Sequence, residues 1–426
     1  MIRTRIMQTL LTFVTAAGVC AAQKVSTQEL LQMARTRATG LEQALRDTLG
    51  EANLQKGTAA AGEMGDFVFA IASEKGPSLQ INYDPPIAAF KAGSLWVVQT
   101  RLNTGTAYKY TWIADGKRIG CSGNECTPAN NLPAFGPDSY AHPGVPEGKL
   151  TGPIEVPSKI YPGVKANVWY YVPAQWDGVT PLAVQVWGDG QQFTGPRPGS
   201  WRILETLDNL TAQKRIPLMV SIFVQAGTGP ERNQRSIEYD TVSDAYLHRL
   251  LDEIFPVVAE HVKMRSDSYS RAIQGLSSGG IMAFNAAFDR PDAFSRVLSW
   301  IGSYTALRRT ADHPEGGAEY PTMVRREAKR NLRVWIEDGS NDLDNTAGNW
   351  PAANIGMADA LKFKGYDYHF SFGVGEHNDA QGAAELPESL TWLWRDYDPA
   401  KTSQEYVQDP GEKDQPAWRV VQLNRK

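Results

Sequence analysis

The feature that most constrains this chain is a serine flanked by glycines between a short apolar segment and a segment of small residues. Residues 269–288 read YSRAIQGLSSGGIMAFNAAF, in which Gly275, Ser277 and Gly279 form the pattern G-x-S-x-G. In a strand, turn, helix context this pattern is a sharp turn that holds the serine in a strained conformation and presents its hydroxyl. We expect both glycines to be needed, because they leave room for the strand and the helix to pass each other. Ser277 is therefore the candidate nucleophile.

A serine hydroxyl becomes a good nucleophile at neutral pH when a histidine takes its proton and an acid orients that histidine. If the acid and the histidine follow the serine, three of the six histidines are candidates. His377 is preferred, because it follows an alternating segment and lies in a glycine-rich loop at a strand end, where catalytic residues are common. His369 lies within the predicted strand and is interpreted as a packing residue. His313 precedes a proline in a polar loop.

The candidate acid lies at the end of another predicted strand, residues 332–338, which runs into a turn rich in acids. Asp342 is the preferred acid. The turn formed by residues 339–341 carries the chain past the strand end, so that Asp342 can reach back toward the histidine. Asp338 is the alternative, although it is still at the strand boundary.

Cleavage of an ester also needs N–H donors for the oxyanion, each of which stabilises it by roughly 3 kcal/mol. The N–H of Ser278 is one candidate, because it directly follows the nucleophile. The second is expected in the loop 188–192, after the predicted strand 181–187. The N–H of Gln191 is favoured there, and a plain turn at Asp189–Gly190 is the alternative.

These motifs resemble those of an esterase family of α/β-hydrolases, which holds enterochelin, feruloyl and acetyl-xylan esterases, S-formylglutathione hydrolases and mycolyltransferases. The resemblance covers about residues 150–397. Its four motifs are Asp189–Gly190 after the oxyanion strand, Gly275–Gly279 around the serine, Gly339–Asp342 at the acid and Gly375–Asn378 at the histidine. Residues 231–240 are also similar to the Arg-rich segment of enterochelin-esterase-like members. Ser278 departs from the methionine that many relatives have there.

The resemblance implies a serine carboxylic-ester hydrolase that works through an acyl-enzyme, without a metal or other cofactor. The implied substrates are aromatic acyl esters, either feruloyl esters of plant polysaccharide or catecholate siderophore esters. Two alternatives remain: acyl transfer to a sugar alcohol, and a non-catalytic binding protein on the same fold. The candidate pocket residues are Trp187, Trp201, Arg235 and Trp350.

Composition narrows the range of partners. The net charge of −4 gives no basic surface for nucleic acid, and no flavin, nicotinamide or phosphate-loop motif stands out. The expected partner is a small-molecule or carbohydrate-linked ester, with no stable membrane insertion. The sequence leaves the oligomeric state open.

The N-terminus predicts export. Residues 1–22 have two arginines, an apolar stretch and small residues at the end, as in a cleaved signal peptide for a secreted or periplasmic protein. Lipoprotein processing at Cys20 is a less favoured alternative. In the mature chain Cys121 and Cys126 are an even pair in a short loop, which predicts a disulfide in an oxidising compartment.

Hydrophobic periodicity divides the rest of the chain. An N-terminal helix is predicted to open with a capping box at Ser26–Glu29, and later segments alternate as strands with a hairpin turn at Asp115–Gly116. The predicted fold is an α/β-hydrolase with a mostly parallel central sheet, preceded by a small β-sandwich that resembles immunoglobulin-like modules. The predicted boundaries are 23–63 for the helical segment, 64–150 for the β-sandwich, 151–400 for the esterase domain and 401–426 for a C-terminal tail.

Overall fold

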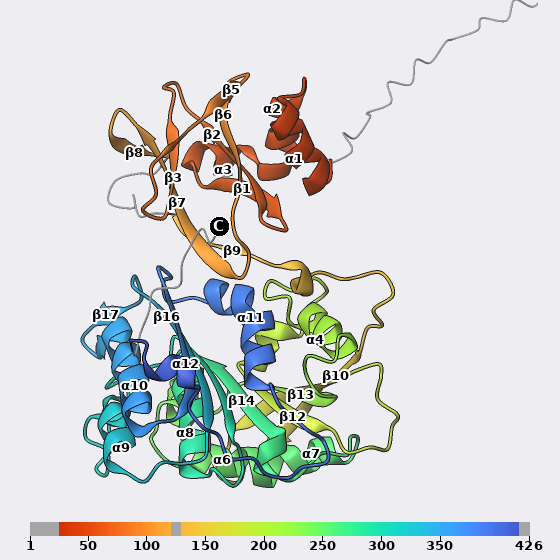
Figure 1. Ribbon diagram of the computed structural model, residues 1–426, viewed down its shortest axis with the longest axis vertical. Coiled ribbons are helices and arrows are strands. Elements are labelled where there is room, and N and C mark those ends of the chain that lie inside the picture. Colours follow the sequence, from red (N-terminus) through yellow and green to blue (C-terminus); the bar gives the residue numbers. More distant parts are fainter. Residues whose placement is uncertain (1–24, 121–128, 417–426) are drawn as a thin grey trace, which may run out of the picture.

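The computed structural model describes residues 25–120 and 129–416. Two units follow one another along the chain (Figure 1): a β-rich unit, which ends with β9, and an α/β unit, which begins with β10. The predicted signal peptide, Cys20, Cys121 and Cys126 lie outside the described residues. Within the two described ranges, no helix is long and apolar enough to cross a membrane.

Three short helices open the β-rich unit: α1 (Thr27–Thr36), α2 (Leu41–Leu49) and α3 (Glu51–Lys56). The predicted capping box is confirmed, because the Glu29 N–H donates to Ser26 Oγ and the Ser26 N–H donates to Glu29 Oε2. The apolar faces of the helices pack on one sheet of the unit. The predicted end of the helical segment at residue 63 is wrong, because residues 59–63 already form a strand.

Two antiparallel sheets form the rest of this unit and enclose a common core that includes Phe69, Leu79 and Tyr110. The hairpin at Asp115–Gly116 is confirmed, with both residues at the positive φ that such a turn requires. The predicted likeness to immunoglobulin modules remains a prediction. One sheet has the order β1 (Ala59–Glu63), β2 (Asp66–Ala72), β6 (Leu95–Arg101), β5 (Phe90–Ala92). The other has β4 (Ile87–Ala88), β3 (Ser78–Ile81), β7 (Thr106–Ala114), β8 (Lys117–Ile119), with β9 (Ala129–Ala134) also paired to β7.

An eight-stranded, mostly parallel sheet forms the centre of the α/β unit, as predicted. The first two strands of the order are antiparallel to their neighbours, and the remaining strands are parallel. The order is β10 (Lys149–Pro157), β11 (Lys165–Val172), β13 (Met219–Val224), β12 (Ala183–Gly188), β14 (Arg271–Leu276), β15 (Arg296–Trp300), β16 (Arg333–Gly339), β19 (Asp367–Gly373).

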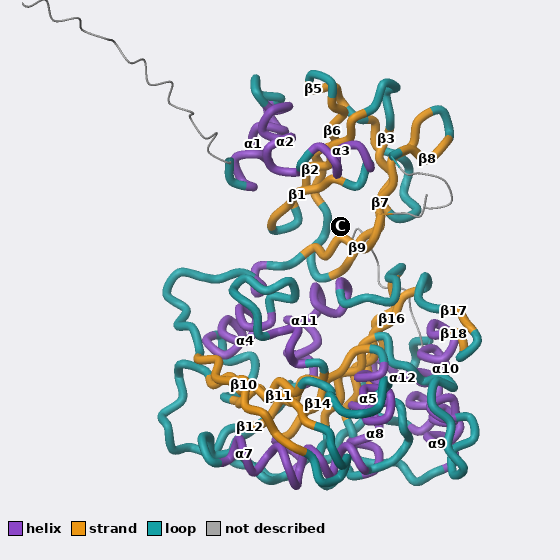
Figure 2. The backbone as a smooth tube through the Cα atoms, turned by 180° about the vertical axis from the view of Figure 1, so that it is seen from behind, coloured by secondary structure: helices purple, strands orange, loops and turns teal. Residues whose placement is uncertain are grey.

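Alternating side chains of these strands enter two separate cores on opposite faces of the sheet. In β12, Val184 and Val186 enter one core, whereas Ala183 and Trp187 enter the other. Figure 2 shows helices on both faces. The first core is covered by α7 (Phe255–Ala259), α8 (Ser278–Asp289) and α10 (Trp350–Lys364), and the second by α4 (Ile203–Ala212) and α11 (Ala380–Leu393).

Shorter elements connect these layers. They are η2 (Pro137–Ser139), η3 (Gly190–Phe193), α5 (Gln234–Tyr239), α6 (Ala245–His248), the π-helical segment η4 (Arg249–Ile254), η5 (Ser268–Ser270), η6 (Gly316–Glu319), α9 (Tyr320–Arg326), β17 (Asp344–Asn345), β18 (Gly348–Asn349) and α12 (Pro410–Lys413). Because β12, β14, β16 and β19 are parallel, the loops that follow them leave the same edge of the sheet.

Candidate active site

The serine lies at a sharp turn between a strand and a helix, as the sequence predicts. β14 ends at Leu276 and α8 begins at Ser278, so that Ser277 alone connects them. Its φ of 61° and ψ of −119° are strained for a residue with a side chain.

The two glycines of the motif contribute differently to this turn. A Cβ at Gly275 would lie 1.9 Å from the carbonyl oxygen of Gly279, so strand and helix could not approach as they do. A Cβ at Gly279 would meet nothing nearer than Asp189 Oδ2 at 3.6 Å, which is an ordinary contact. The expectation that both glycines are needed is therefore wrong for Gly279.

The structure brings the three predicted side chains together at the sheet edge. His377 Nε2 lies 2.7 Å from Ser277 Oγ, and His377 Nδ1 lies 2.5 Å from Asp342 Oδ1. A carboxylate accepts the Nδ1 proton, which leaves Nε2 as the acceptor for the serine hydroxyl. The Asp342 side chain is fully buried, and the His377 side chain is 20% exposed. The arrangement can therefore remove a proton from Ser277.

The acid turn (residues 339–342) also holds the histidine loop (residues 374–379). The Asn341 N–H donates to Gly375 O at 3.0 Å, and Asn341 Nδ2 donates to Val374 O at 3.0 Å. The same asparagine thus binds the two consecutive backbone carbonyls that directly precede Glu376. These bonds explain how two loops that are more than thirty residues apart in sequence stay in register.

Asp338, the alternative acid, lies behind Asp342 and not beside the histidine. Burial, and then the hydrogen bond to Asp342, raises the pKa of Asp338 well above its usual range. The Gly339 N–H donates to Asp338 Oδ1 at 2.7 Å. Burial therefore favours the protonated form of Asp338, whose hydroxyl can donate to the Asp342 carboxylate.

Ser303, a neighbour of the candidate nucleophile Ser277, is a residue that the sequence did not single out. Its Oγ lies 3.3 Å from Ser277 Oγ, and Trp350 Nε1 lies 3.1 Å from Ser303 Oγ. Because an indole N–H only donates, Ser303 accepts from Trp350 and has its own proton for Ser277. The hydrogen bonds therefore run in one direction from Trp350 through Ser303 and Ser277 to His377. No local sequence signal marks Ser303, which follows the end of β15 by three residues.

The two expected oxyanion donors lie on α8 and η3, which follow parallel strands at the same edge of the central sheet. Ser278 is the first residue of α8, whose opening N–H groups have no acceptor within the helix. Gln191 lies in η3 directly after Gly190, where a Cβ would lie 2.4 Å from the backbone of β13. The glycine therefore lets this turn pack closely against the sheet.

An ion pair ties the turn before Gln191 to the serine turn. Arg235 Nε lies 2.9 Å from Asp189 Oδ1 and its second nitrogen lies 2.7 Å from Oδ2, a bidentate pair. The same guanidinium donates to the Leu276 carbonyl at 3.2 Å. Arg235 thus ties the turn after β12 to the end of β14, beside the two predicted donors.

The four candidate pocket residues divide into two pairs. Trp187 and Trp201 are buried in the second core, where each packs on the ring of Phe193, so the prediction that they line a pocket is wrong. Trp350 is also buried, but its ring lies edge-on to His377 at 5.6 Å. Arg235 is 39% exposed in its side chain and adjoins the serine turn. The sequence could not separate the pairs, because aromatic residues fill cores and sites alike.

Comparison with known proteins identifies a family for this chain. A model of the family described as "Putative esterase" matches residues 161–393, more than half of the chain. An iron(III) enterobactin esterase from Dickeya dadantii (strain 3937) is 25% identical over 253 residues, which are 56% of this chain and 54% of that protein. The chain thus spans about half the length of this curated relative.

Two solved structures are similar at lower identity. A crystal structure of ferric enterobactin esterase from Salmonella typhimurium has a TM-score of 0.52 and 18% identity, covering 79% of this chain and 97% of that one. A ferulic acid esterase from the anaerobic fungus Anaeromyces mucronatus has a TM-score of 0.45 and 16% identity, covering 60% of this chain and 93% of that one. The likeness to the Salmonella structure supports the fold.

Proposed function

Because the chain belongs to the putative-esterase family, we propose that it is a serine carboxylic-ester hydrolase acting on aromatic acyl esters. The observation that carries the proposal is the continuous set of hydrogen bonds from Asp342 through His377 to Ser277. A serine in a strained turn with an oriented imidazole in contact is equipped for acyl transfer.

In the proposed mechanism Ser277 attacks the ester carbonyl while His377 Nε2 takes its proton. The buried carboxylate of Asp342 stabilises the imidazolium that forms and keeps Nδ1 protonated. The N–H groups of Ser278 and Gln191 donate to the oxyanion. His377 then protonates the leaving alcohol, which leaves the acyl group on Ser277. Water, deprotonated by His377, attacks this acyl-enzyme and releases the acid and the free serine.

The proposed acyl group is aromatic, as in catecholate siderophore esters and feruloyl esters. The name of the Dickeya relative, an iron(III) enterobactin esterase, supports the siderophore ester. Arg235 supports a phenolic acyl group, because its partly exposed side chain, which is paired with Asp189, lies beside the serine turn. We further propose export to the periplasm or beyond, on the evidence of residues 1–22 and the cysteine pair.

The two alternatives predict different products. A transferase would form the same acyl-enzyme but pass the acyl group to a sugar alcohol in preference to water. A binding protein would form no acyl-enzyme at all, which the intact contact between Ser277 and His377 argues against.

The test compares the wild-type protein with Ser277→Ala on p-nitrophenyl acetate, methyl ferulate and a catecholate trilactone. The variant should lose about a millionfold in turnover on every ester that the wild type cleaves, with an unchanged circular dichroism spectrum. The matched control is Ser73→Ala, at a partly exposed serine of the β-rich unit. A folded Ser277→Ala variant that keeps more than a few per cent of activity would contradict the proposal. Product analysis with added sugar separates hydrolysis from transfer.

A further inference from the structure

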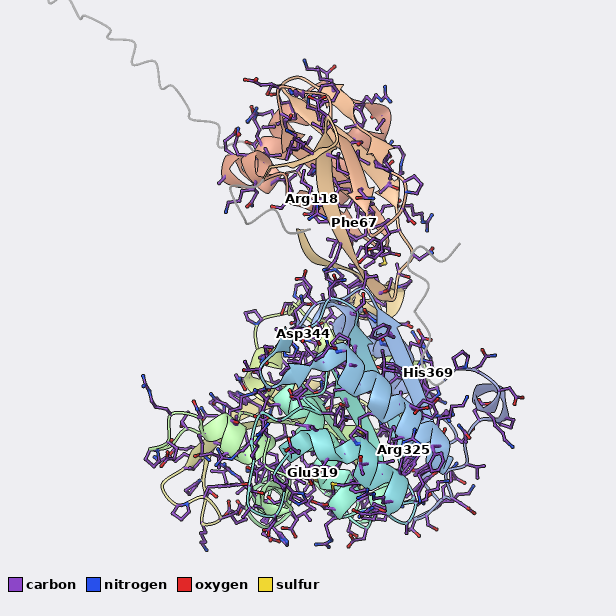
Figure 3. The ribbon with its side chains drawn as sticks, turned by 90° about the vertical axis from the view of Figure 1, so that its left-hand side faces the viewer. Phe67, Arg118, Glu319, Arg325, Asp344 and His369 are labelled. Carbon is purple, nitrogen blue, oxygen red and sulfur yellow. The ribbon has the colours of Figure 1, made fainter. Side chains whose placement is uncertain are left out.

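A lysine of the β-rich unit reaches the loop that carries the histidine. Lys109 lies within β7, and its Nζ is 2.7 Å from Glu376 Oε1, on the residue directly before His377. In Figure 3, Asp344, which follows the acid turn, lies on the side of the α/β unit that faces the β-rich unit, where Phe67 lies. The sheet edge with the proposed site therefore faces the other unit.

This ion pair is shielded from water. The Lys109 side chain is 8% exposed and that of Glu376 is 26% exposed. An ammonium taken out of water needs a carboxylate partner, and removing either partner leaves an uncompensated charge. The contact is therefore far more costly to break than the exposed pairs on the surface of the molecule.

The backbone around Lys109 is held firmly. The Lys109 N–H donates to Asn82 Oδ1 at 2.9 Å, and the Asn82 N–H donates to Lys109 O at 2.7 Å. β7 also pairs with β3, β8 and β9. The β-rich unit thus presents the ammonium from a rigid strand.

The histidine loop depends on several anchors, and Lys109 holds the one nearest the imidazole on the N-terminal side. Val374 and Gly375 are tied to Asn341 of the α/β unit. After the histidine, Asn378 Oδ1 accepts from the Ala380 N–H at 3.1 Å, which opens α11. α11 itself contacts β7 and β9. The Glu376 carboxylate, by contrast, forms its ion pair with Lys109 of the β-rich unit.

We propose that Lys109 is a positioning residue for the proposed ester hydrolysis, which fixes the histidine loop through Glu376 and makes the β-rich unit part of the catalytic architecture. This inference rests on the proposed function. The inference goes beyond the proposed function, because every residue to which that function assigns a chemical role follows position 188, whereas Lys109 lies in the β-rich unit. The β-rich unit then affects the cleavage of esters that are too small to touch it.

The test is made in the full-length protein with p-nitrophenyl acetate. Lys109→Met keeps the length of the side chain but removes the charge, and it should lower kcat by roughly 10–100-fold with little change in KM. A misplacement of about 1 Å has effects of this size. Lys109→Arg should recover most of the loss, and Glu376→Gln should show the same loss as Lys109→Met.

The matched control is Lys75→Met, in the same unit. It removes an ion pair with Asp115 in which each side chain is 68% exposed. It should leave kcat unchanged. Unchanged kcat in both Lys109→Met and Glu376→Gln would overturn the inference. So would a loss of kcat that Lys109→Arg does not recover at all, because the charge would then have no part in it.

Hydrogen exchange of the segment 374–379 separates this inference from the proposed function. Lys109→Met and Glu376→Gln should speed exchange there, and Lys75→Met should not. This result is expected whether or not the wild type cleaves an ester. If the wild type cleaves none of the esters but exchange changes as expected, the proposed function fails and the contact to the loop stands. Unchanged exchange in both variants overturns the contact.

Discussion

At the scale of single residues, the proposed nucleophile, Ser277, is held from two sides. Ser277 gives its proton to His377 and accepts one from Ser303, which in turn accepts from Trp350. Ser303→Ala removes the donor to Ser277 and leaves the triad intact, so we expect kcat on p-nitrophenyl acetate to fall by about tenfold, the value of one such hydrogen bond. Ser303→Thr should recover much of it.

The control for this prediction is Ser299→Ala. Ser299 is also buried, and its Oγ bonds Tyr304 Oη at 3.0 Å, away from the nucleophile. A sulfonyl fluoride reacts directly with the serine hydroxyl. Its inactivation rate therefore measures the reactivity of Ser277 without depending on how an ester substrate binds. Equal rates for the wild type and Ser303→Ala would show that the serine pair is only packing.

The two acids of the acid turn should behave differently on substitution. Asp342→Asn presents the wrong tautomer of His377 and should lower kcat by about 10⁴-fold. Asp338→Asn should lose much less, because burial already raises the pKa of Asp338 and an amide N–H can replace its proton toward Asp342. Steady-state kinetics of both variants on one ester checks the ranking, and the reverse order would move the acid to Asp338.

The sequence could predict Ser277, Asp342 and His377 as a set because each follows an apolar strand and the chemistry requires the three types. It could not predict Ser303, since a serine after a strand has no signature until the strand order places it beside the nucleophile. The same holds for Lys109, because its contact joins β7 to a residue 267 positions later in the sequence, in the loop after β19.

At the scale of elements, Gly275 and Gly279 offer a test of the serine turn. Gly275→Ala forces the new Cβ into the Gly279 carbonyl, so the variant should fail to fold or lose several kcal/mol of stability. Gly279→Ala adds a methyl group that makes only ordinary contacts within α8 and should equal or exceed the wild type, by up to about 1 kcal/mol. Thermal unfolding of the two variants checks this, and equal damage from both would contradict it.

The end of α8 carries a second element-scale prediction. Burial raises the pKa of Asp289 to about 6, and its negative charge also opposes the dipole at a helix C-terminus. The folded state then binds this proton more tightly than the unfolded state, whose pKa is about 4. The charge therefore costs stability progressively as the pH rises from about 4 through 6, with the full cost above that.

Asp289→Asn removes this cost. We expect its Tm to exceed that of the wild type by a few degrees at pH 8 and to match it near pH 3, where the carboxyl is protonated in both the folded and the unfolded wild type. Calorimetry at the two pH values checks the difference. An equal gain in Tm at the two pH values would show that the charge of Asp289 is not the source of the gain.

Hydrophobic runs predicted most strands of the central sheet, but two were not identified. β10 contains two prolines and a bulge, and β15 is five residues long with an arginine and a serine. Both are in the sheet because neighbouring strands satisfy their backbone groups, which local pattern does not report. The segment 59–63 was assigned to a helix for a similar reason: its three alanines favour helix, and pairing with β2 decides otherwise.

At the scale of the whole molecule, the C-terminal segment closes the end of the sheet opposite the proposed site. The Tyr406 ring is 1% exposed and lies 5.3 Å from the buried guanidinium of Arg296 and 4.8 Å from that of Arg333. Three further rings surround Arg296, whose terminal nitrogens make no hydrogen bond within the described structure. Aromatic faces here take the place of a carboxylate for a buried cation.

This arrangement makes the stability of the α/β unit depend on residues beyond its last long helix. Tyr406→Ala uncovers Arg296 and Arg333 and should lower the free energy of unfolding by about 3–5 kcal/mol, the usual cost of deleting a buried ring. Tyr406→Phe keeps the ring and loses the 3.0 Å hydrogen bond to Ser295, so its cost should be about 1 kcal/mol. Val407→Ala, at a neighbouring side chain that is 67% exposed, should stay within about 0.5 kcal/mol of the wild type. Urea unfolding of the three variants measures the order. If Tyr406→Ala lost no more free energy of unfolding than Val407→Ala, the C-terminal segment would be a surface extension, as its charged, proline-interrupted sequence suggests. Arg296 would then be stabilised by the remaining rings.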